Sequence, residues 1–524
     1  MEDSSASNSF MAMKIFCLLI LLTTASSIKM HAQLEDNTWL LGGSITSFDS
    51  SVYKGCVVSF EDGDATFELT PGQLPIERTN CVLSDSTGTL ACFTNGENVY
   101  NRNYEIMEGG ENFYPNAVYQ GGFPAIQSYL MLPFPGRPHH VAYVYGRIKV
   151  VTTPLGGFIG YPQLMTATIN LQANGGMGKV VERDILISSD TLGVGHITTV
   201  RHGNGRDWWM FIPHVYQEDR LYTFLITPEG VLPQGSVDVP LTSFGLGQVC
   251  FSPDGQWYGR FNAHGNVPDS SFSTFDIYRF DRCLGTFSDR VTKTYNEDGT
   301  QGKPGGIAFS NSSRFLYISR WDTIFQYDLQ APDILASEVV VAAYDGFTAD
   351  YNLPTLFYSL QLAPDNKIYC CVSNVNSRYL HVIENPDSAG LACNVQQHSI
   401  HLPVFNIFLL PNMPYYRLWN WEDSPCDTLT TISTGFVSKP ETAMRLYPNP
   451  VSDILSVDLS GEMPKDGLLL VTDVTGKLLK SLTLTHQTGI YQIDMSSFPE
   501  GIYFITFQNA LGRIISNKCI VAPN

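Results

Sequence analysis

Three histidines, His196, His202 and His214, are the residues of this sequence whose type and spacing come nearest to a metal site. They stand 6 and 12 residues apart, so on adjacent strands their imidazole rings could converge on a metal such as zinc. Histidines scattered over loops are more commonly structural or solvated, and that interpretation stays open beside the first. The adjacent pair His139-His140 follows the loop sequence PGRP and has no spacing that favours a site.

Two acidic turns could hold calcium, which takes oxygen ligands. Their sequences are EDGD at 61–64 and NEDG at 296–299. Neither has the ligand spacing of an EF-hand loop, and Asp, Asn and Gly are the ordinary residues of turns. We predict no cofactor and no metal ligand, with calcium as the one ion that these turns suggest.

The sequence DWW at 207–209 could offer an aromatic platform to a sugar ring. The alternative is that Trp208 and Trp209 point to opposite faces of one strand and pack in the core, because successive side chains of a strand alternate. No HExxH, GxSxG or GxxxxGK[ST] motif occurs in the chain. We therefore assign no catalytic residue.

The composition indicates which secondary-structure elements would position any such site. The chain has 524 residues, of which 44 are Gly and 30 are Pro, and aromatic residues make up 12%. Turn formers and aromatic residues at this frequency favour many short strands, and the length suggests two to four domains. An all-β fold is expected.

Three phrases in the second half of the chain share one pattern of strand, tight turn and returning aromatic strand. They are FSPDGQWY at 251–258, FSNSSRFLYI at 309–318 and LAPDNKIYC at 362–370. Their starts lie 58 and 53 residues apart, and each is followed by a further strand ending in an acid, at 278–281, 325–328 and 381–384. Two hairpins repeated every 50 to 60 residues indicate the four-stranded blades of a β-propeller.

Weaker versions of the pattern occur in the first half, at 81–93, 205–212 and 221–230. Residues 33–426 then provide for about seven blades. A series of stacked two-sheet sandwiches is the competing architecture, but it predicts no regular blade-length period. We expect a propeller over 33–426.

The N-terminus has the pattern of a secretory signal peptide. Lys14 precedes the apolar run IFCLLILL at 15–22, and small residues follow. The run is too short to span a membrane, which takes about 20 apolar residues. We predict a true start at Met13, a signal peptide within residues 1–32, cleavage before Gln33, and no transmembrane segment in the mature chain.

The net charge of −19 argues against nucleic acid or an anionic membrane surface as a partner. No CxxC pair is present, which leaves thiolate zinc sites and thioredoxin-like chemistry without support. Export permits disulfides, and Cys81 with Cys92 or Cys393 with Cys426 are conceivable pairs. Free buried thiols on strands are the alternative.

The last part of the chain reads as a separate small β domain. A Thr- and Ser-rich linker at 427–441 precedes it, and Leu455, Val457 and Leu459 alternate with polar residues as in a half-buried strand. A hairpin at 468–484 and two strands at 501–507 and 514–521 complete it. We expect an immunoglobulin-like β-sandwich over 442–524.

Four features of this domain, in order, carry a resemblance. They are YPNP at 447–450, DVTGK at 473–477, PEGIY at 499–503, and Gly512 with Lys518 near the end. The set resembles the C-terminal sorting domain of type IX secretion cargo. The resemblance implies a Bacteroidetes cell, periplasmic transit, handling by the type IX machinery, and release or display at the outer-membrane surface.

The middle region resembles secreted, WD-repeat-like propeller proteins of the same bacterial group. The similarity rests on SDSTG at 84–88, MEGG at 107–110 and HGNGRDWW at 202–209, together with the repeated phrases. NSS at 311–313 departs from the usual Pro-Asp-Gly turn.

Two functions fit these observations. The first is a non-catalytic module that binds an extracellular glycan or protein, because variable loops on a rigid disc and abundant aromatic residues supply contact area. The second is a secreted hydrolase or lyase that acts on polysaccharide or peptide. That enzyme would need two carboxylates about 5 to 9 Å apart near the propeller axis. We expect the binding module.

Overall fold

A computed structural model describes the chain over residues 33–42, 54–61, 63–74, 76, 80–114, 126–147, 149–153, 156–214, 220–240, 246–264, 272–296, 303–374, 376–408, 410–422, 424–426, 444–459, 467–473, 477–484, 490–509 and 514–522. The predicted signal peptide, 1–32, and the predicted linker, 427–441, lie outside these residues. The chain divides into two units, 1–431 and 432–524.

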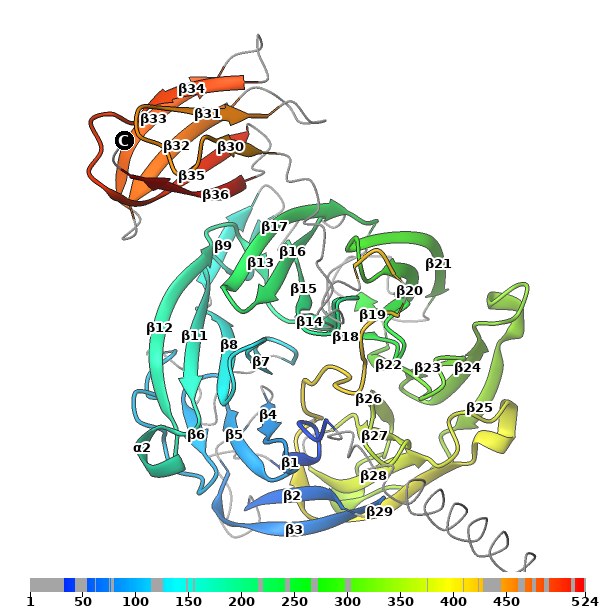
Figure 1. Cartoon of the computed structure of the whole chain (residues 1–524). Helices are drawn as coiled ribbons and strands as arrows, with labels where there is room; N and C mark the ends of the chain where they lie inside the picture. Colours follow the sequence, from blue (N-terminus) through cyan, green and yellow to red (C-terminus); the bar gives the residue numbers. More distant parts are fainter. Residues whose placement is uncertain are drawn as a thin grey trace, which may run out of the picture. The chain divides into compact units, whose positions relative to one another are not determined.

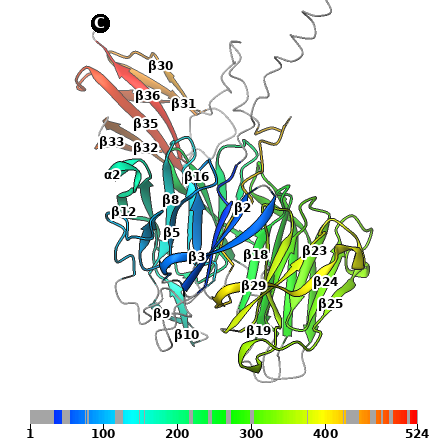
Figure 2. The ribbon, with the colours of Figure 1, turned by 90° about the horizontal axis from the view of Figure 1, so that it is seen from below.

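The first unit is a β-propeller. Its described strands form seven antiparallel sheets around a common centre, one after another in chain order (Figure 1). Figure 2 shows the same sheets from below. This arrangement confirms the predicted propeller over the series of sandwiches, and about seven blades were expected.

The strands of each sheet follow the chain. The first three blades contain β1 (Thr38–Gly42), β2 (Lys54–Glu61) and β3 (Asp64–Gln73); β4 (Cys81–Ser84), β5 (Leu90–Thr94) and β6 (Val99–Asn101); and β7 (Leu130–Pro133), β8 (His140–Gly146), β11 (Leu164–Asn170) and β12 (Lys179–Ser188). The next two contain β14 (Thr198–Arg201), β15 (Trp208–Pro213), β16 (Arg220–Thr227) and β17 (Gly230–Asp238); and β18 (Leu246–Phe251), β19 (Trp257–His264), β20 (Phe272–Asp281) and β21 (Thr286–Asn296). The last two contain β22 (Gly305–Phe309), β23 (Phe315–Arg320), β24 (Thr323–Asp328) and β25 (Val339–Ala343); and β26 (Phe357–Leu362), β27 (Ile368–Val372), β28 (Ser377–Ile383) and β29 (Val395–Asn406).

A few elements lie outside this pattern. The hairpin β9 (Lys149–Thr153) and β10 (Gly156–Tyr161) is inserted between β8 and β11 and pairs with β13 (Leu192–Gly193). Short helical turns occur at α2 (Ala173–Gly176), η1 (Leu335–Ser337), η2 (Asp350–Asn352) and η3 (Gly390–Cys393).

The three repeated phrases form hairpins, as predicted, and the structure shows that each joins the first and second strands of a blade. Each turn needs one residue with positive φ, and this residue is Gly255 at 69°, Ser313 at 59° and Asn366 at 64°. Positive φ favours glycine, but single Asn residues and small polar residues adopt it at modest cost. The sequence NSS therefore keeps the turn that PDG makes.

The core lies between neighbouring blades. Inner strands such as β4, β14 and β22 are buried at every position, while the outer strand β21 is mostly exposed. A cluster that includes Trp257, Phe261, Phe309 and Leu316 joins the fifth and sixth blades. Because each sheet buries both faces against its neighbours, removing one blade would expose two apolar faces.

The ring closes through side chains of its first and last blades. The indole of Trp39 meets the ring of Tyr369 edge-on, with centroids 5.6 Å apart. The Asn406 carboxamide oxygen accepts a hydrogen bond from the Gly42 N–H at 3.3 Å. Residues more than 300 positions apart therefore hold the disc closed.

The second unit is a two-sheet β-sandwich. One sheet contains β30 (Arg445–Tyr447), β31 (Ile454–Asp458) and β34 (Ile490–Asp494), and the other contains β33 (Leu478–Leu484), β32 (Gly467–Asp473), β35 (Gly501–Asn509) and β36 (Ile514–Val521). Leu455 and Val457 are fully buried and pack in one core with Leu469 and Ile505 of the other sheet. The predicted alternation and hairpin are both present.

The cysteines correct one expectation. Cys426 forms a disulfide with Cys283, not with Cys393. Cys81, Cys92 and Cys393 are free and buried. The pairings were wrong because sequence proximity does not report which strand ends meet on one face of a propeller, and the free thiols agree with the alternative.

Candidate binding site

The centre of the propeller is occupied by its own C-terminal segment, residues 410–422 (Figure 1, the gold trace through the middle of the ring). Asn412 of this segment makes hydrogen bonds to residues of three blades. Its N–H donates to the Asn80 carbonyl at 2.9 Å, and its Nδ2 donates to the carbonyls of Tyr129 at 2.9 Å and Ile197 at 3.2 Å. These three residues precede the inner strands β4, β7 and β14, so Asn412 ties three blades together through its backbone N–H and its carboxamide.

Other carboxamides satisfy the inner strand edges. Gln127 accepts from the N–H of Val249 and donates to its carbonyl, both at 2.8 Å. Gln248 makes the same pair of hydrogen bonds with Leu360. A carboxamide carries both a donor and an acceptor, so one side chain can replace the missing neighbouring strand.

Little free space remains at the axis. The cavity there has a volume of about 50 Å³ and is lined by Asp36, Trp39 and inner-strand residues of β14, β18, β22 and β26. Ligand pockets span about 300–1,000 Å³, so this cavity has room for water molecules but not for a substrate.

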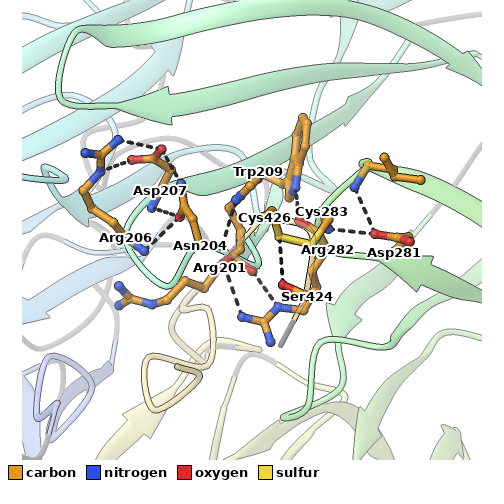
Figure 3. The surroundings of a disulfide bond; sticks show 12 residues. Arg201, Asn204, Arg206, Asp207, Trp209, Asp281, Arg282, Cys283, Ser424 and Cys426 are labelled. Atoms are coloured by element: carbon orange, nitrogen blue, oxygen red, sulfur yellow. Dashed lines mark hydrogen bonds and ion pairs between the residues drawn. A yellow bond between two sulfur atoms is a disulfide. The ribbon is translucent and has the colours of Figure 1, made fainter. Parts of the chain in front are cut away.

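A disulfide clasp fixes the end of the axial segment (Figure 3). Cys283, in the turn after β20, is joined to Cys426 with their Cα atoms 5.5 Å apart. Beside it, Arg282 donates to the carbonyl of Arg201 at 2.9 Å and to that of Trp419 at 2.5 Å. The N–H of Trp421 donates to the carbonyl of Gly203 at 2.7 Å.

A larger pocket opens between the second and third blades. We call it the turn-face pocket, because the turns after β4 and after β7 form its two walls. Its volume is about 450 Å³, within the range of small-molecule sites. Leu83, Phe134, Val141 and Leu171 supply apolar lining.

Glu35, one of the lining residues, has a carboxylate oxygen without a hydrogen-bond partner among the described residues. The segment before β1 holds it in place, because the Ser84 N–H donates to the Glu35 carbonyl at 2.8 Å. The oxygen without a partner is Oε2, and it is buried. Burial and the charge of Asp36 raise the pKa of Glu35, and a backbone hydrogen bond together with the charges of Arg201 and Arg417 opposes this only in part.

A second carboxylate, Asp85, lines the same pocket but is engaged by its own turn. Its Oδ1 accepts from the Thr87 N–H at 2.9 Å, from the Thr87 hydroxyl at 2.5 Å and from the Thr89 N–H at 3.3 Å. Its Oδ2 lies 3.7 Å from the guanidinium of Arg102. Asp85 therefore shapes the wall of the pocket.

The opposite wall carries basic groups. Arg137 donates through Nε to the carbonyl of Pro228 at 2.6 Å, and its guanidinium lies 4.3 Å from the centre of the Phe134 ring. His139 is exposed and has a φ of 61°, and His140 begins β8. The pair that the sequence left without a role thus lies at the mouth of the pocket.

The structure separates the three histidines of the proposed metal site. His196 precedes β14 and His202 follows it, so the two lie at opposite ends of that strand, while His214 lies after β15 at the His196 end. Desolvation lowers the pKa of His196 to about 4, so its imidazole is neutral at physiological pH. Among the described residues no three His, Cys, Asp or Glu side chains come together as a metal site.

Trp208 and Trp209 belong to the core. They are 1% and 7% exposed and belong to different apolar clusters, which fits packing on opposite faces of β15. Trp208 meets Tyr416 edge-on, and Trp209 donates through Nε1 to the Arg282 carbonyl at 2.8 Å. Neither offers a sugar platform.

The two acidic turns proposed for calcium are only partly described. Asp62 of the first and residues 297–299 of the second lie outside the described part of the chain. Calcium binding there stays untested.

Sequence reasoning missed Glu35 and the axial segment. Glu35-Asp36 was visible as an acidic pair after the predicted cleavage point, and Arg417 as a lone cation between aromatic residues. Their roles depend on contacts between the two ends of the propeller, and no local pattern reports those.

The fold defines a β-propeller followed by a small C-terminal β-sandwich. Residues 445–522 match the family model described as the secretion system C-terminal sorting domain. This match supports the predicted type IX resemblance and indicates export to the cell surface or beyond. In the described part of the chain no helix has the length and apolar character to cross a membrane.

The solved structures that resemble this chain are only distantly similar to it. A hypothetical selenium-binding protein from Sulfolobus tokodaii is 10% identical, with 71% of this chain and 91% of that chain covered and a TM-score of 0.39. A soluble aldose sugar dehydrogenase from Escherichia coli is 13% identical, with 57% and 93% covered and a TM-score of 0.31. Likenesses this distant carry no argument about function. None of the curated proteins matches the chain.

Proposed function

We propose that this protein is a non-catalytic binding module, exported by the type IX pathway to the cell surface or the medium, which holds an extracellular ligand in its turn-face pocket. The observation that carries the proposal is the turn-face pocket itself, which has a volume of about 450 Å³ and is lined by both apolar side chains and polar residues such as Arg137 and His139.

The pocket supports binding more than catalysis. A glycoside hydrolase of the usual kind works with two carboxylates in distinct roles. Here Asp85 is engaged by three donors of its own turn, and the Oε2 atom of Glu35 is buried. A hydrolase is the second candidate, because the raised pKa of Glu35 would suit a general acid.

The test is an array of glycans and matrix proteins probed with the mature protein, beside a panel of hydrolase substrates. Ser86→Trp would fill the pocket from an exposed wall position, and Gln256→Trp is the matched control at an exposed position in the turn after β18. We expect binding that Ser86→Trp abolishes and Gln256→Trp preserves, without turnover. Turnover that Glu35→Gln abolishes would establish the hydrolase instead, and binding insensitive to Ser86→Trp would remove the pocket from the proposal.

A further inference from the structure

We infer that Arg137 anchors a sugar acid in the turn-face pocket, by binding the single carboxylate of that sugar through its two terminal nitrogens. The inference rests on the proposed binding function and names the chemical class of the ligand. Three features of the pocket lead to it: a fixed guanidinium with a free edge, the balance of charge around it, and the engagement of the backbone in both walls.

Arg137 is held on three sides, and the end of its side chain stays free. Its Nε donates to the carbonyl of Pro228 in the next blade at 2.6 Å, and its guanidinium lies 4.3 Å from the centre of the Phe134 ring. Its backbone N–H donates to the Phe134 carbonyl at 3.1 Å. None of these contacts uses Nη1 or Nη2. A planar carboxylate can therefore accept two parallel hydrogen bonds from this edge, and little side-chain entropy is lost because the guanidinium is already fixed.

The charge of Arg137 has no carboxylate partner among the described residues, whereas the carboxylates near the pocket each have one. These pairs are Asp85 with Arg102 at 3.7 Å, Asp36 with Arg417 at 2.7 Å, and Glu35 with Arg201, whose charges attract each other. Glu229, which follows Pro228 in the chain, instead accepts a hydrogen bond from the Thr227 hydroxyl at 2.7 Å. One positive charge therefore remains at the pocket, and one carboxylate neutralises it.

The match of one charge to one charge also limits the anion. A phosphate monoester carries about two negative charges at neutral pH and would bring an excess toward the wall that contains Asp85. A polyanion would be repelled at long range by the net charge of −19. We therefore expect a monosaccharide acid, or the terminal acid of an otherwise neutral chain.

The backbone of the two walls disfavours an extended peptide as the source of the carboxylate. Peptides in extended form bind through rows of backbone donors and acceptors. Most backbone N–H groups of these walls already donate to carbonyl oxygens of the fold, namely those of Ser84, Asp85, Phe134, Arg137, His140 and Leu171. Recognition in this pocket therefore depends on side chains.

The side chains beside the guanidinium suit the rest of a sugar. The Nδ1 atom of His140 lies 2.9 Å from the Pro138 carbonyl, which can only accept, so Nδ1 carries the proton. In the neutral imidazole Nε2 is then free to accept a hydrogen bond from a sugar hydroxyl. Ser86 lines the pocket at an exposed position, and the partly exposed Pro133 and Leu171 can contact CH groups.

The experiment measures binding of matched sugars to the mature full-length protein by isothermal titration calorimetry. The probes are glucuronate, galacturonate and mannuronate, each beside the neutral sugar that lacks the carboxylate. A glucose phosphate serves as the dianion, and N-acetyl-triglycine serves as a peptide carboxylate. We expect at least one uronate to bind about tenfold or more tightly than its neutral counterpart, the phosphate and the peptide.

Three variants connect the result to Arg137. Arg137→Met removes the guanidinium, and we expect it to weaken uronate binding about 10- to 100-fold. Arg137→Lys keeps the charge but not the paired donors, so its affinity should lie between those of the parent and Arg137→Met. The matched control is Arg314→Met, because that guanidinium also lies beside an aromatic ring, 4.9 Å from Phe315, but is paired with Asp328 at 2.7 Å. The control should bind like the parent, and tryptophan fluorescence checks that all three variants are folded.

Binding of a neutral sugar, the phosphate or the peptide that Ser86→Trp abolishes, without a preference for a uronate, would overturn this inference and leave the proposed function standing. Uronate binding that Arg137→Met or Ser86→Trp leaves unchanged would overturn it as well, and so would an Arg137→Lys variant that binds as tightly as the parent. If no probe, glycan or protein binds in a manner that Ser86→Trp abolishes, the proposed function itself fails.

Discussion

The guanidinium of Arg417 makes two hydrogen bonds, at 2.7 and 2.8 Å, to the carboxylate of Asp36, which stands 381 residues earlier in the chain. Asp36 lies just before the first inner strand, and Arg417 lies in the segment that fills the propeller axis. The pair therefore joins the start and the end of the ring. Its side chains are 9% and 26% exposed, so the carboxylate is the more deeply buried partner.

Replacing Arg417 should lower the free energy of unfolding more than replacing Asp36. Arg417→Met leaves a carboxylate buried without its partner, and we expect a loss of about 2–3 kcal/mol, below the roughly 3–5 of a fully buried pair. In Asp36→Asn the guanidinium can turn to water, and about 1 kcal/mol should be lost. Urea unfolding followed by tryptophan fluorescence measures this, because all 7 Trp residues lie before position 432. The opposite order would contradict the burial argument.

The stability of the Arg417→Met variant should approach that of the parent protein as the pH falls. Burial raises the pKa of Asp36, and in the parent protein Arg417 opposes that rise. A carboxyl whose pKa is higher in the folded state favours folding below its unfolded value near 4 and loses this contribution as the pH rises through the folded value. The gap between parent and variant should narrow from pH 7 to pH 4. A constant gap would show that lost packing, not charge, is responsible.

The disulfide clasp should stabilise the propeller. Cys283 and Cys426 enclose a separation of 143 residues, and closing a loop of that size contributes up to about 5 kcal/mol, with about 2–5 kcal/mol typical. We expect dithiothreitol to lower the urea midpoint of the parent and to leave the midpoint of the double variant Cys283→Ser/Cys426→Ser unchanged. Mass spectrometry of peptides from the unreduced protein checks the pairing. Finding Cys393 linked to Cys426 would overturn it.

The turn after β22 should respond differently to two small substitutions. Ser313 has a φ of 59°, and its hydroxyl accepts a hydrogen bond from the Asp254 N–H at 3.0 Å in the neighbouring blade. Ser313→Ala and Ser313→Gly both lose that bond, but only glycine relieves the backbone strain. Ser313→Gly should therefore be about 1 kcal/mol more stable than Ser313→Ala. Equal stabilities would mean that the turn relaxes.

Deleting residues 442–524 should leave the propeller folded and prevent its export. The sandwich has its own core, formed by residues such as Leu455 and Ile505, and the family match at 445–522 lies within the deleted part. We expect the truncated protein in the periplasm with an unchanged tryptophan spectrum. Its appearance in the medium would refute the sorting role, and unfolding would refute the independence of the two units.

The mature protein should begin at Gln33. Residues 13–32 carry the signal-peptide pattern. Intact mass measurement of the exported protein tests this. A mass that includes the apolar run at 15–22 would show that the segment is retained.

The sequence determined the strands, the turns and the C-terminal sorting domain of this protein. The phrases at 251–258, 309–318 and 362–370 predicted the first hairpin of three blades, because turn residues and alternating apolar residues act over a few neighbouring positions. The alternation of Leu455 and Val457 predicted a half-buried strand in the same way. Those features depend on local backbone preferences, which a single sequence displays.

Only the tertiary structure decided what lies at the centre and which groups meet. Asn412, Arg417 and Cys426 belong to a segment without regular secondary structure, so no periodicity marked it, and its partners are Asn80, Asp36 and Cys283. Glu35 stands out only because the fold buries its Oε2 atom without a hydrogen-bond partner, whereas the same carboxylate on the surface would be hydrated. Closing the ring brings residues hundreds of positions apart into contact, and that closure is a property of the packed blades rather than of any stretch of sequence.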